Sequence, residues 1–246
     1  MQTLSAAKQE LDAIRREVVS NLPLIEHPVV QARIRGELSL DQVRKIEVQH
    51  YYEARFFSTF VLNTIKNCND DLEARKLMAE NWASEATGAD DHATLILRLL
   101  DALGVPRELA YRAEPTPGMA AWHHIEEQIT SRSDFVTAVA SLWIGEPEYP
   151  AVASALHKAY QEVYGLPLAA LQTYHTHAEH DPEHGNVEER ILIEAVARDP
   201  SILPGLKRVC REAYWGYVFS FDGYWQAATG RHEFWSGLGR TFPDPA

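Results

Sequence analysis

The sequence predicts an all-α protein that folds as a compact helical bundle. Apolar residues recur at three- and four-residue spacing along most of the 246 residues, which is the period of one helix face. Alternating polar and apolar runs bounded by turn pairs, the pattern typical of strands, are missing. With 46% hydrophobic and 24% charged residues, the chain is expected to bury a packed core. We expect helices over residues 4–20, 28–35, 39–66, 70–103, 116–130, 132–145, 149–164, 167–195 and 200–228.

Capping and helix-breaking residues support these boundaries in chain order. Ser39, followed by Asp41 and Gln42, has the pattern of an N-terminal cap. The other boundaries are expected at Asn69 and Asp70, at Gly104 to Pro106, at Ser133, at Gly165 with Pro167, and at Asp199 with Pro200. We expect residues 1–230 to form one helical domain and residues 231–246 to form an irregular C-terminal tail.

The composition excludes several classes of partner. Lys and Arg number 23 against 35 Asp and Glu, a formal net charge of −12, so nucleic acid is not an expected partner. No window approaches 18 consecutive apolar residues and the N-terminus lacks a signal-peptide pattern, so neither a membrane span nor export is expected. Two isolated cysteines, Cys68 and Cys210, suit a reducing compartment. These observations predict a cytoplasmic protein.

The segment HTHAEHDPEHG concentrates histidines and acids. His177, Asp181 and His184 are spaced i, i+4 and i+7, which places them within roughly 60° of one another around a helix. A face of two imidazoles and one carboxylate suits iron, manganese or zinc and leaves coordination positions open. The alternative is an exposed, acidic helix that binds nothing.

A second candidate pair is Glu85 and His92, seven residues apart and so on one face if the helix is continuous. Gly88 lies on that same face, and a glycine inside a helix suggests that something approaches the backbone there. The alternative is that Glu85 and His92 are unrelated surface residues beside Asp90 and Asp91.

A further carboxylate, Glu146, follows a strongly apolar predicted helix. It is either a surface residue at a helix end or a buried acid that needs a partner. Glu148 is a rival two residues away, but positions two apart on a helix point in nearly opposite directions, so only one of them can serve a site. Together these segments supply three carboxylates and three histidines from separate helices, enough for two metal ions in a bundle.

The order and spacing of these residues resemble those of the haem-oxygenase-like di-iron oxidases and oxygenases. The pattern is E-x6-H, then a lone Glu about 54 residues further on, and then H-x3-D-x2-H. Their fold relatives include thiaminase II (TenA) and the PQQ-synthesis oxidases, and the sequence is similar to the chlamydial CADD-like proteins. The resemblance implies two iron ions, with a manganese–iron pair as the variant. The implied ligands are Glu85, His92, Glu146, His177, Asp181 and His184.

This resemblance also implies an O2-dependent oxidoreductase whose partners are dioxygen and a small organic substrate, an amino acid or another carboxylate. The electrons for repeated turnover would come from an external donor, because no nucleotide-binding fingerprint occurs in the chain. Arg55 could bind a substrate carboxylate, although a structural salt bridge is the more frequent use of such an arginine. Fold relatives are commonly dimers, and Phe234 and Trp235 in the tail predict an apolar patch for a homodimer contact.

Two alternatives remain open. CADD-like proteins that build 4-aminobenzoate consume a tyrosine of their own with help from a lysine, and Val30 and Leu156 stand at those positions here. Tyrosines occur nearby, so a shifted residue could serve the same activity. The other alternative is a non-catalytic interaction protein of the same fold. The thiaminase relatives rely on a nucleophilic cysteine in the region of residues 138–143. No cysteine occurs there in this chain, so a thiaminase-like activity is disfavoured.

Overall fold

Helices account for all the regular structure in the part of the chain that is described, which confirms the all-α prediction. The computed structural model describes residues 2–20, 22–231 and 234–235, apart from the side chains of residue 84 and residues 179–186. The α-helices are α1 (Leu4–Val19), α2 (Pro28–Ile34), α3 (Leu40–Lys66), α4 (Leu72–Ala86), α5 (His92–Ala102), α6 (Arg107–Tyr111), α7 (Pro117–Arg132), α8 (Phe135–Gly145), α9 (Tyr149–Glu162), α10 (Gln172–Arg198) and α11 (Leu203–Thr229). Short 3-10 turns are η1 (Leu24–Glu26), η2 (Glu146–Glu148), η3 (Leu168–Ala170) and η4 (Pro200–Ile202).

Local side chains explain several helix ends. Ser39 forms the expected capping box, in which its hydroxyl accepts from the Gln42 N–H and the Gln42 side chain accepts from the Ser39 N–H. Two other N-terminal caps were predicted at the wrong residue. Asp71 caps α4 in place of Asn69 or Asp70, and Asp134 caps α8 in place of Ser133. In each case an acid closer to the apolar run accepts the free helix N–H.

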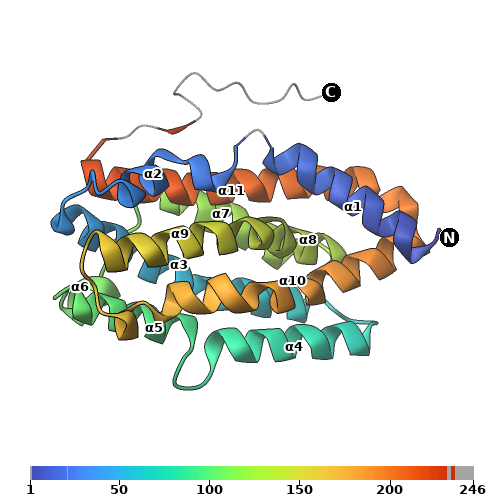
Figure 1. The fold of residues 1–246 in the computed structure, drawn as a ribbon. Coiled ribbons are helices and arrows are strands. Elements are labelled where there is room, and N and C mark those ends of the chain that lie inside the picture. Colours follow the sequence, from blue (N-terminus) through green and yellow to red (C-terminus); the bar gives the residue numbers. More distant parts are fainter. Residues whose placement is uncertain (1, 21, 232–233, 236–246) are drawn as a thin grey trace.

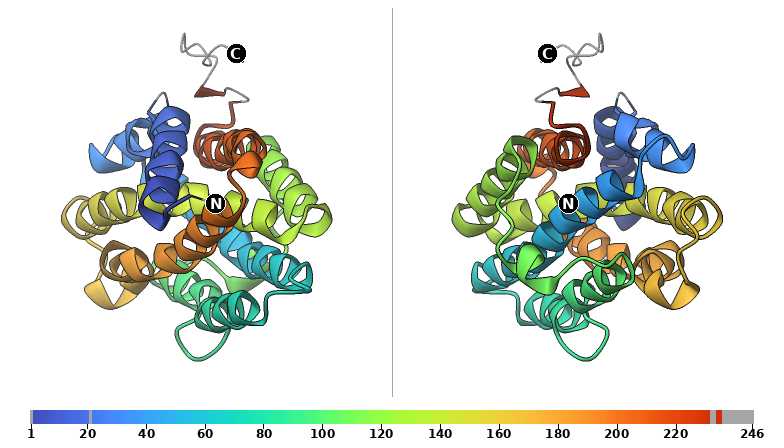
Figure 2. Two further views of the ribbon diagram at one scale, coloured as in Figure 1. Left: turned by 90° about the vertical axis from the view of Figure 1, so that its right-hand side faces the viewer. Right: turned by 90° about the vertical axis from the view of Figure 1, so that its left-hand side faces the viewer.

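The long helices α3, α7, α10 and α11 build the bundle around one apolar core (Figure 1). Figure 2, which looks along the bundle, shows α1 and α11 on one side and α4 and α5 on the other. Helix α11 packs against α7, α8 and α3. Its closest approach to α7 is at Gly118 and Gly223, where a Cβ on Gly118 would lie 2.3 Å from the backbone oxygen of Phe219. Only glycine lets the two backbones come this near.

The predicted helix over residues 70–103 is wrong in one respect: it is two helices, α4 and α5. Gly88 lies in the connection with a φ of +97°, a left-handed conformation, and nothing lies within 4 Å of a Cβ built on it. The glycine therefore serves the turn and not a close approach by another group. Asp91 then caps α5 by accepting from the N–H of Thr94 at 2.9 Å. The short helix α6 was not predicted.

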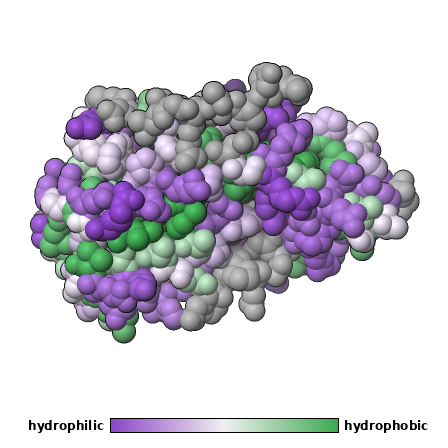
Figure 3. Space-filling view, turned by 45° about the horizontal axis from the view of Figure 1, so that its top comes forward, coloured by the Kyte–Doolittle hydropathy of each residue, from purple (hydrophilic) through white to green (hydrophobic). Residues whose placement is uncertain are grey.

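The tail contact predicted for a second subunit loses Trp235, one of its two residues, because Trp235 packs on its own chain. Its exposed fraction is 4%, and its backbone N–H donates to the Asp222 carboxylate at 2.7 Å. Its ring centroid lies 5.0 Å from that of His27. On the face shown in Figure 3, hydrophilic residues predominate and hydrophobic residues form smaller patches. The homodimer stays a prediction without this support. Within the described part of the chain, none of the helices has both the length and the apolar composition that crossing a bilayer requires.

Candidate metal centre

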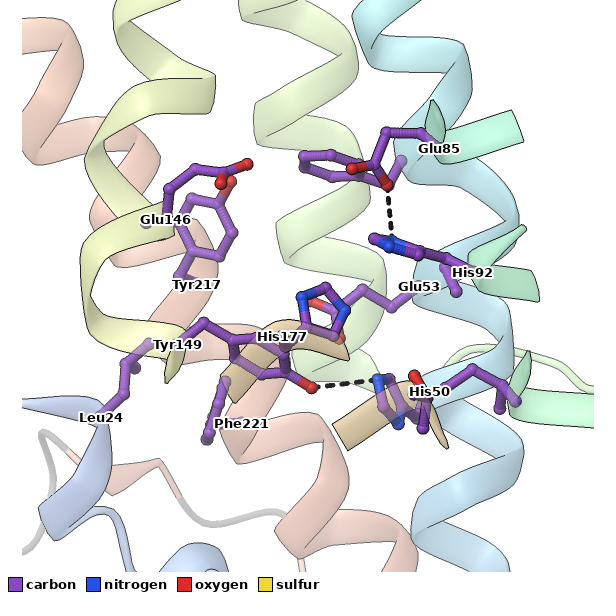
Figure 4. A pocket seen from close by; sticks show the side chains of 15 residues that line it. Leu24, His50, Glu53, Glu85, His92, Glu146, Tyr149, His177, Tyr217 and Phe221 are labelled. Carbon is purple, nitrogen blue, oxygen red and sulfur yellow. Dashed lines mark hydrogen bonds and ion pairs between the residues drawn. The ribbon is translucent and has the colours of Figure 1, made fainter. Parts of the chain in front are cut away.

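A cavity of about 100 Å³ lies inside the bundle, between α3, α5, α10 and α11 (Figure 4). Its apolar walls include Leu24, Phe57, Ile96 and Phe221. Its polar lining combines acids, imidazoles and hydroxyls: His50, Glu53, Glu85, His92, Glu146, Tyr149, Thr173, His177 and Tyr217. A polar group set inside apolar walls is the usual character of a small-molecule or metal site.

Four of the six predicted ligands line this cavity. Glu85 comes from the last turn of α4, His92 from the first turn of α5, Glu146 from η2 and His177 from α10. The Nδ1 atom of His92 lies 2.5 Å from Oε2 of Glu85, and the ring centroids of His92 and His177 are 4.5 Å apart. The pair Glu85 and His92 therefore shares one site although a helix break separates the two residues.

Asp181 and His184, the other two predicted ligands, lie on α10 outside the residues whose side chains the structure describes. Among the described side chains, no group of three His, Cys, Asp or Glu is close enough together to hold a metal ion. The donor chemistry nevertheless suits iron, since two carboxylates and two imidazoles from separate helical elements line one cavity. In this structure the side chains of Glu85 and His92 contact each other. Each side chain would have to turn toward a metal ion in order to bind it.

Glu146 and its rival Glu148 have different surroundings. Glu146 lines the cavity, whereas Glu148 is not part of the lining and is near Arg15 and Tyr214. Burial raises the pKa of the Glu148 carboxyl, and the charge of Arg15 opposes that shift. The 3-10 geometry of η2 therefore sends the two side chains in different directions, as the sequence predicts for residues two apart.

Next to the cavity lies a buried hydrogen-bond network that the sequence did not predict. His50 places Nδ1 2.9 Å from Oε2 of Glu47, and the Tyr149 hydroxyl lies 3.2 Å from His50 Nε2. A carboxylate can only accept, so this assignment has Nδ1–H donating to Glu47 and Nε2 accepting from Tyr149. The ring of Tyr149 meets that of His177 edge to face, with 4.7 Å between centroids.

The carboxylate of Glu47 is the centre of this network. The hydroxyls of Tyr160 and Tyr174 both donate to its Oε1, at 2.5 and 2.9 Å, and Arg33 lies 3.6 Å from the same oxygen. Burial alone would raise the pKa of Glu47, but the hydrogen bond from His50 and the nearby charge of Arg33 hold it below its ordinary value. Glu47 is therefore a buried, ionised and fully partnered acid.

A second acid pair, Glu53 and Glu126, has the opposite environment. Burial raises the pKa of Glu53 to about 7. Burial, followed by the charge of Glu53, raises the pKa of Glu126 to about 8. Glu126 is 1% exposed and neither carboxylate oxygen has a hydrogen-bond partner in the described structure. Both acids are thus held toward their neutral forms.

The sequence offered weak signals for these additional residues. His50 and Glu53 lie three residues apart on α3 and share a face with Ala54 and Phe57, all four lining the cavity. In the sequence these four residues have the pattern of an ordinary helix face, and only the packing of the other helices shows that they line a cavity. Glu126 stands beside Glu127, and nothing in the local sequence distinguishes the buried acid from the partly exposed one.

Arg55, considered as a carboxylate-binding residue, is not at the cavity. Its Nη1 donates to the Tyr111 carbonyl at 3.2 Å and its guanidinium lies 4.7 Å from the ring centroid of Phe56. No lysine or arginine lines the cavity within the described part of the chain. The cavity therefore has acids and imidazoles but no permanent cation.

Comparison with known proteins shows the family to which the chain belongs. A family described as iron-containing redox enzymes matches residues 44–215. A Chlamydia muridarum protein named 4-aminobenzoate synthase is 31% identical, over 86% of this chain and 88% of its own length.

Solved structures with 14–15% identity share the fold. A Shewanella denitrificans domain with a heme oxygenase-like fold has a TM-score of 0.72 and covers 95% of this chain and 100% of its own. A CADD-like protein from Nostoc punctiforme has a TM-score of 0.71 (92% and 98%), and a TenA homologue from Pseudomonas syringae has one of 0.68 (90% and 92%). The fold is thus haem-oxygenase-like, and the chain belongs to the family of iron-containing redox enzymes.

Proposed function

We propose that this protein is an O2-dependent non-haem di-iron oxidase or oxygenase that acts on a small organic substrate. The observation that carries the proposal is the convergence of Glu85, His92, Glu146 and His177 on one cavity. These residues were predicted from sequence spacing together with the family resemblance, and they come from four different elements. Unrelated surface residues would not meet in this way.

Two iron ions would be held by the carboxylates and imidazoles of the six nominated residues. Glu85 and His92 would bind one ion, and His177 with His184 the other, while Asp181 and Glu146 complete or bridge the pair. When bound, ferrous iron would supply electrons to dioxygen, and an external reductant would restore them. A manganese–iron pair suits the same donors.

The chain's own residues would bind the substrate and keep water out. Leu24, Phe57, Ile96 and Phe221 make the walls apolar, so polar interactions inside are strengthened. Tyr149, fixed by its hydrogen bond to His50, holds the ring of His177 edge-on. This support would orient a ligand imidazole in the way that partners of metal-binding histidines usually do.

The proposal is tested by loading purified protein with ferrous iron without air and then admitting dioxygen. We expect a near-ultraviolet absorption and consumption of dioxygen that increases with a suitable substrate from a panel of amino and fatty acids. A protein that retains only zinc, stays colourless and consumes no dioxygen would contradict it. This contradicting outcome would favour a non-catalytic interaction protein.

A second candidate function is 4-aminobenzoate synthesis from the protein's own side chain, and the name of the chlamydial relative favours it. Val30 and Leu156, which stand where a tyrosine and a lysine are expected, are buried and do not line the cavity. Tyr149 and Tyr217 do line it. The test is to give iron-loaded protein reductant and dioxygen without added substrate. If this candidate is correct, 4-aminobenzoate is released and the mass of the protein changes; otherwise neither occurs.

The cytoplasmic location and the homodimer are further parts of the proposal. Both cysteines are free and buried, which agrees with a reducing compartment. Light scattering of the purified protein would decide the oligomeric state: a particle of the 27.8 kDa chain mass would contradict the dimer.

A further inference from the structure

The hydroxyl of Thr173 is buried at the cavity without a hydrogen-bond partner. Thr173 lies in the first turn of α10 and is one of the residues that line the cavity. Its exposed fraction is 1%, and its Oγ1 atom has no partner in the described structure. A buried hydroxyl that stays unpaired costs free energy, so such a group calls for an explanation.

Other threonines in the helices of this chain satisfy their hydroxyls within the helix. Four of them donate to the backbone carbonyl four residues earlier, at 2.6–3.0 Å: Thr64, Thr87, Thr130 and Thr229. The same bond would join Thr173 to the carbonyl of Ala169, but that residue belongs to the 3-10 turn η3 and the bond is not formed. The start of α10 therefore leaves the Thr173 hydroxyl unused.

Thr173 is on the same side of α10 as a proposed metal ligand. It precedes His177 by four residues, and both residues line the cavity. Residues four apart are neighbours on one helix face. An unused hydroxyl is therefore next to the imidazole that would hold one of the metal ions.

Hydrogen-bond donors inside the cavity are otherwise engaged or directed to acids. The Tyr149 hydroxyl donates to His50 at 3.2 Å. In Figure 4 the Tyr217 hydroxyl points toward the carboxylate of Glu146. A carboxylate can only accept a hydrogen bond, whereas a threonine hydroxyl can donate one. Thr173 thus offers a donor to whatever small ligand the cavity binds.

We propose that the Thr173 hydroxyl donates a hydrogen bond to the outer atom of a small, electron-rich ligand at the metal centre, a place that dioxygen takes in the reaction. The inference rests on the proposed function for the metal ions, and it adds a ligand-binding residue outside the six nominated metal ligands. A cavity of about 100 Å³ has room for a ligand of a few atoms. The apolar walls would strengthen such a hydrogen bond and so fix the direction of the ligand.

The test uses azide as the probe, with iron-loaded protein oxidised to the ferric state and binding followed by visible absorption. Thr173→Val removes the hydroxyl and keeps the branched shape. We expect azide to bind about tenfold more weakly to Thr173→Val, as the loss of one hydrogen bond to a charged acceptor allows, and to bind normally to Thr173→Ser. The infrared stretching band of bound azide should shift in Thr173→Val and return in Thr173→Ser.

The matched control is Thr176→Val, on the same helix and adjacent to His177. The Thr176 hydroxyl accepts from the Gln172 side chain at 3.4 Å, and Thr176 does not line the cavity. This variant should bind azide as the wild type does. All the variants should keep the iron content of the wild type, because Thr173 is not proposed as a metal ligand.

Urea unfolding of the metal-free protein supplies a readout that does not depend on iron. Because the Thr173 hydroxyl has no partner in the fold, Thr173→Val should unfold at the same urea concentration as the wild type or at a higher one. Thr173→Ala and Thr173→Ser differ only by the hydroxyl, and this pair repeats the azide comparison if the valine variant does not fold.

Several results would overturn the inference. They are unchanged azide affinity in Thr173→Val, a weakened affinity that Thr173→Ser does not restore, and equal weakening in Thr176→Val. Loss of iron from Thr173→Val would also overturn it, since the residue would then support the metal ions themselves. Lower stability of both Thr173→Val and Thr173→Ala than of Thr173→Ser would do the same, because the hydroxyl would then have a partner in the fold.

The two proposals fail in different ways. Cobalt(II) suits the same donors as iron and allows the azide titration to be repeated. A protein that binds cobalt but not iron, and whose azide affinity depends on the Thr173 hydroxyl, would contradict the di-iron function alone. A protein that retains iron and consumes dioxygen, but binds azide equally well in the wild type and Thr173→Val, would contradict only the role of Thr173.

Discussion

We expect the protein to lose stability as pH rises from about 5 to about 8, and replacing Glu126 by Gln should remove much of that loss. The folded-state pKa of this carboxyl is about 8 against an ordinary value of 4.5. Between those values the folded state binds more protons than the unfolded state, so the free energy of unfolding falls with increasing pH. The stability is fully present below the ordinary pKa and is lost as pH rises through the folded value.

The size of the effect follows from the difference between the two pKa values. Each pKa unit corresponds to about 1.4 kcal/mol, and partial hydration of the ionised acid reduces the total, so we expect about 2–4 kcal/mol across the window. Glutamine has the shape of the neutral acid and does not ionise. The variant should therefore resemble the wild type near pH 5 and exceed its stability near pH 8, with a residual slope from Glu53, whose pKa is about 7.

The assay is urea unfolding followed by helical circular dichroism at three pH values across this window. Glu127→Gln, at the next position of α7, reports the effect of removing a carboxylate whose side chain accepts a hydrogen bond from Asn63. Parallel pH dependence in the wild type and Glu126→Gln would refute the reasoning. It would mean that Glu126 is ionised in the fold and has a partner.

Three other perturbations have definite expected outcomes. His177→Ala should lose iron, measured by metal analysis, while its helical dichroism stays near that of the wild type, because the core supplies most of the stability; loss of the whole fold would indicate a structural histidine. Gly118→Ala should destabilise by about 3 kcal/mol or more in urea unfolding, since its Cβ would lie 2.3 Å from a backbone oxygen of α11, whereas Gly216→Ala, with its nearest atom at 3.5 Å, should cost under about 1 kcal/mol. Glu47→Gln should lower the free energy of unfolding by about 3–5 kcal/mol because it leaves Arg33 as an uncompensated buried charge; an unchanged value would show that the pair is not buried.

Helical spacing singled out Glu85, His92 and His177, and the family resemblance added Glu146; all four line the cavity. Glu85 and His92 illustrate both the strength and the limit of such reasoning. Their seven-residue spacing predicted that the two side chains are neighbours, and they are. The prediction assumed one continuous helix, whereas the two residues lie on separate helices. The turn at Gly88 and the cap at Asp91 bring α5 back beside α4, so the two side chains still meet.

The acids and tyrosines beside the cavity could not be predicted in this way. Glu47 owes its role to Tyr160 on α9 and Tyr174 on α10, more than one hundred residues away. Glu126 is set apart from Glu127 only by how α7 packs. Contacts between distant segments leave no periodic signal in one sequence.

The tail shows a similar limit. Trp235 was expected to cover a partner because its composition is apolar, but Asp222 accepts its backbone N–H and His27 packs on its ring. An apolar side chain near a chain end can be buried by its own fold or by another subunit. Composition does not distinguish these two cases.

The most direct test of the di-iron assignment is the iron content of Glu146→Ala and Glu148→Ala after ferrous loading without air. Glu146 lines the cavity and Glu148 does not, although they are two residues apart. We predict two iron ions per chain in the wild type and in Glu148→Ala, as two metal ions in a helical bundle require, and a lower content in Glu146→Ala. Full iron content in Glu146→Ala together with loss in Glu148→Ala would contradict the assignment.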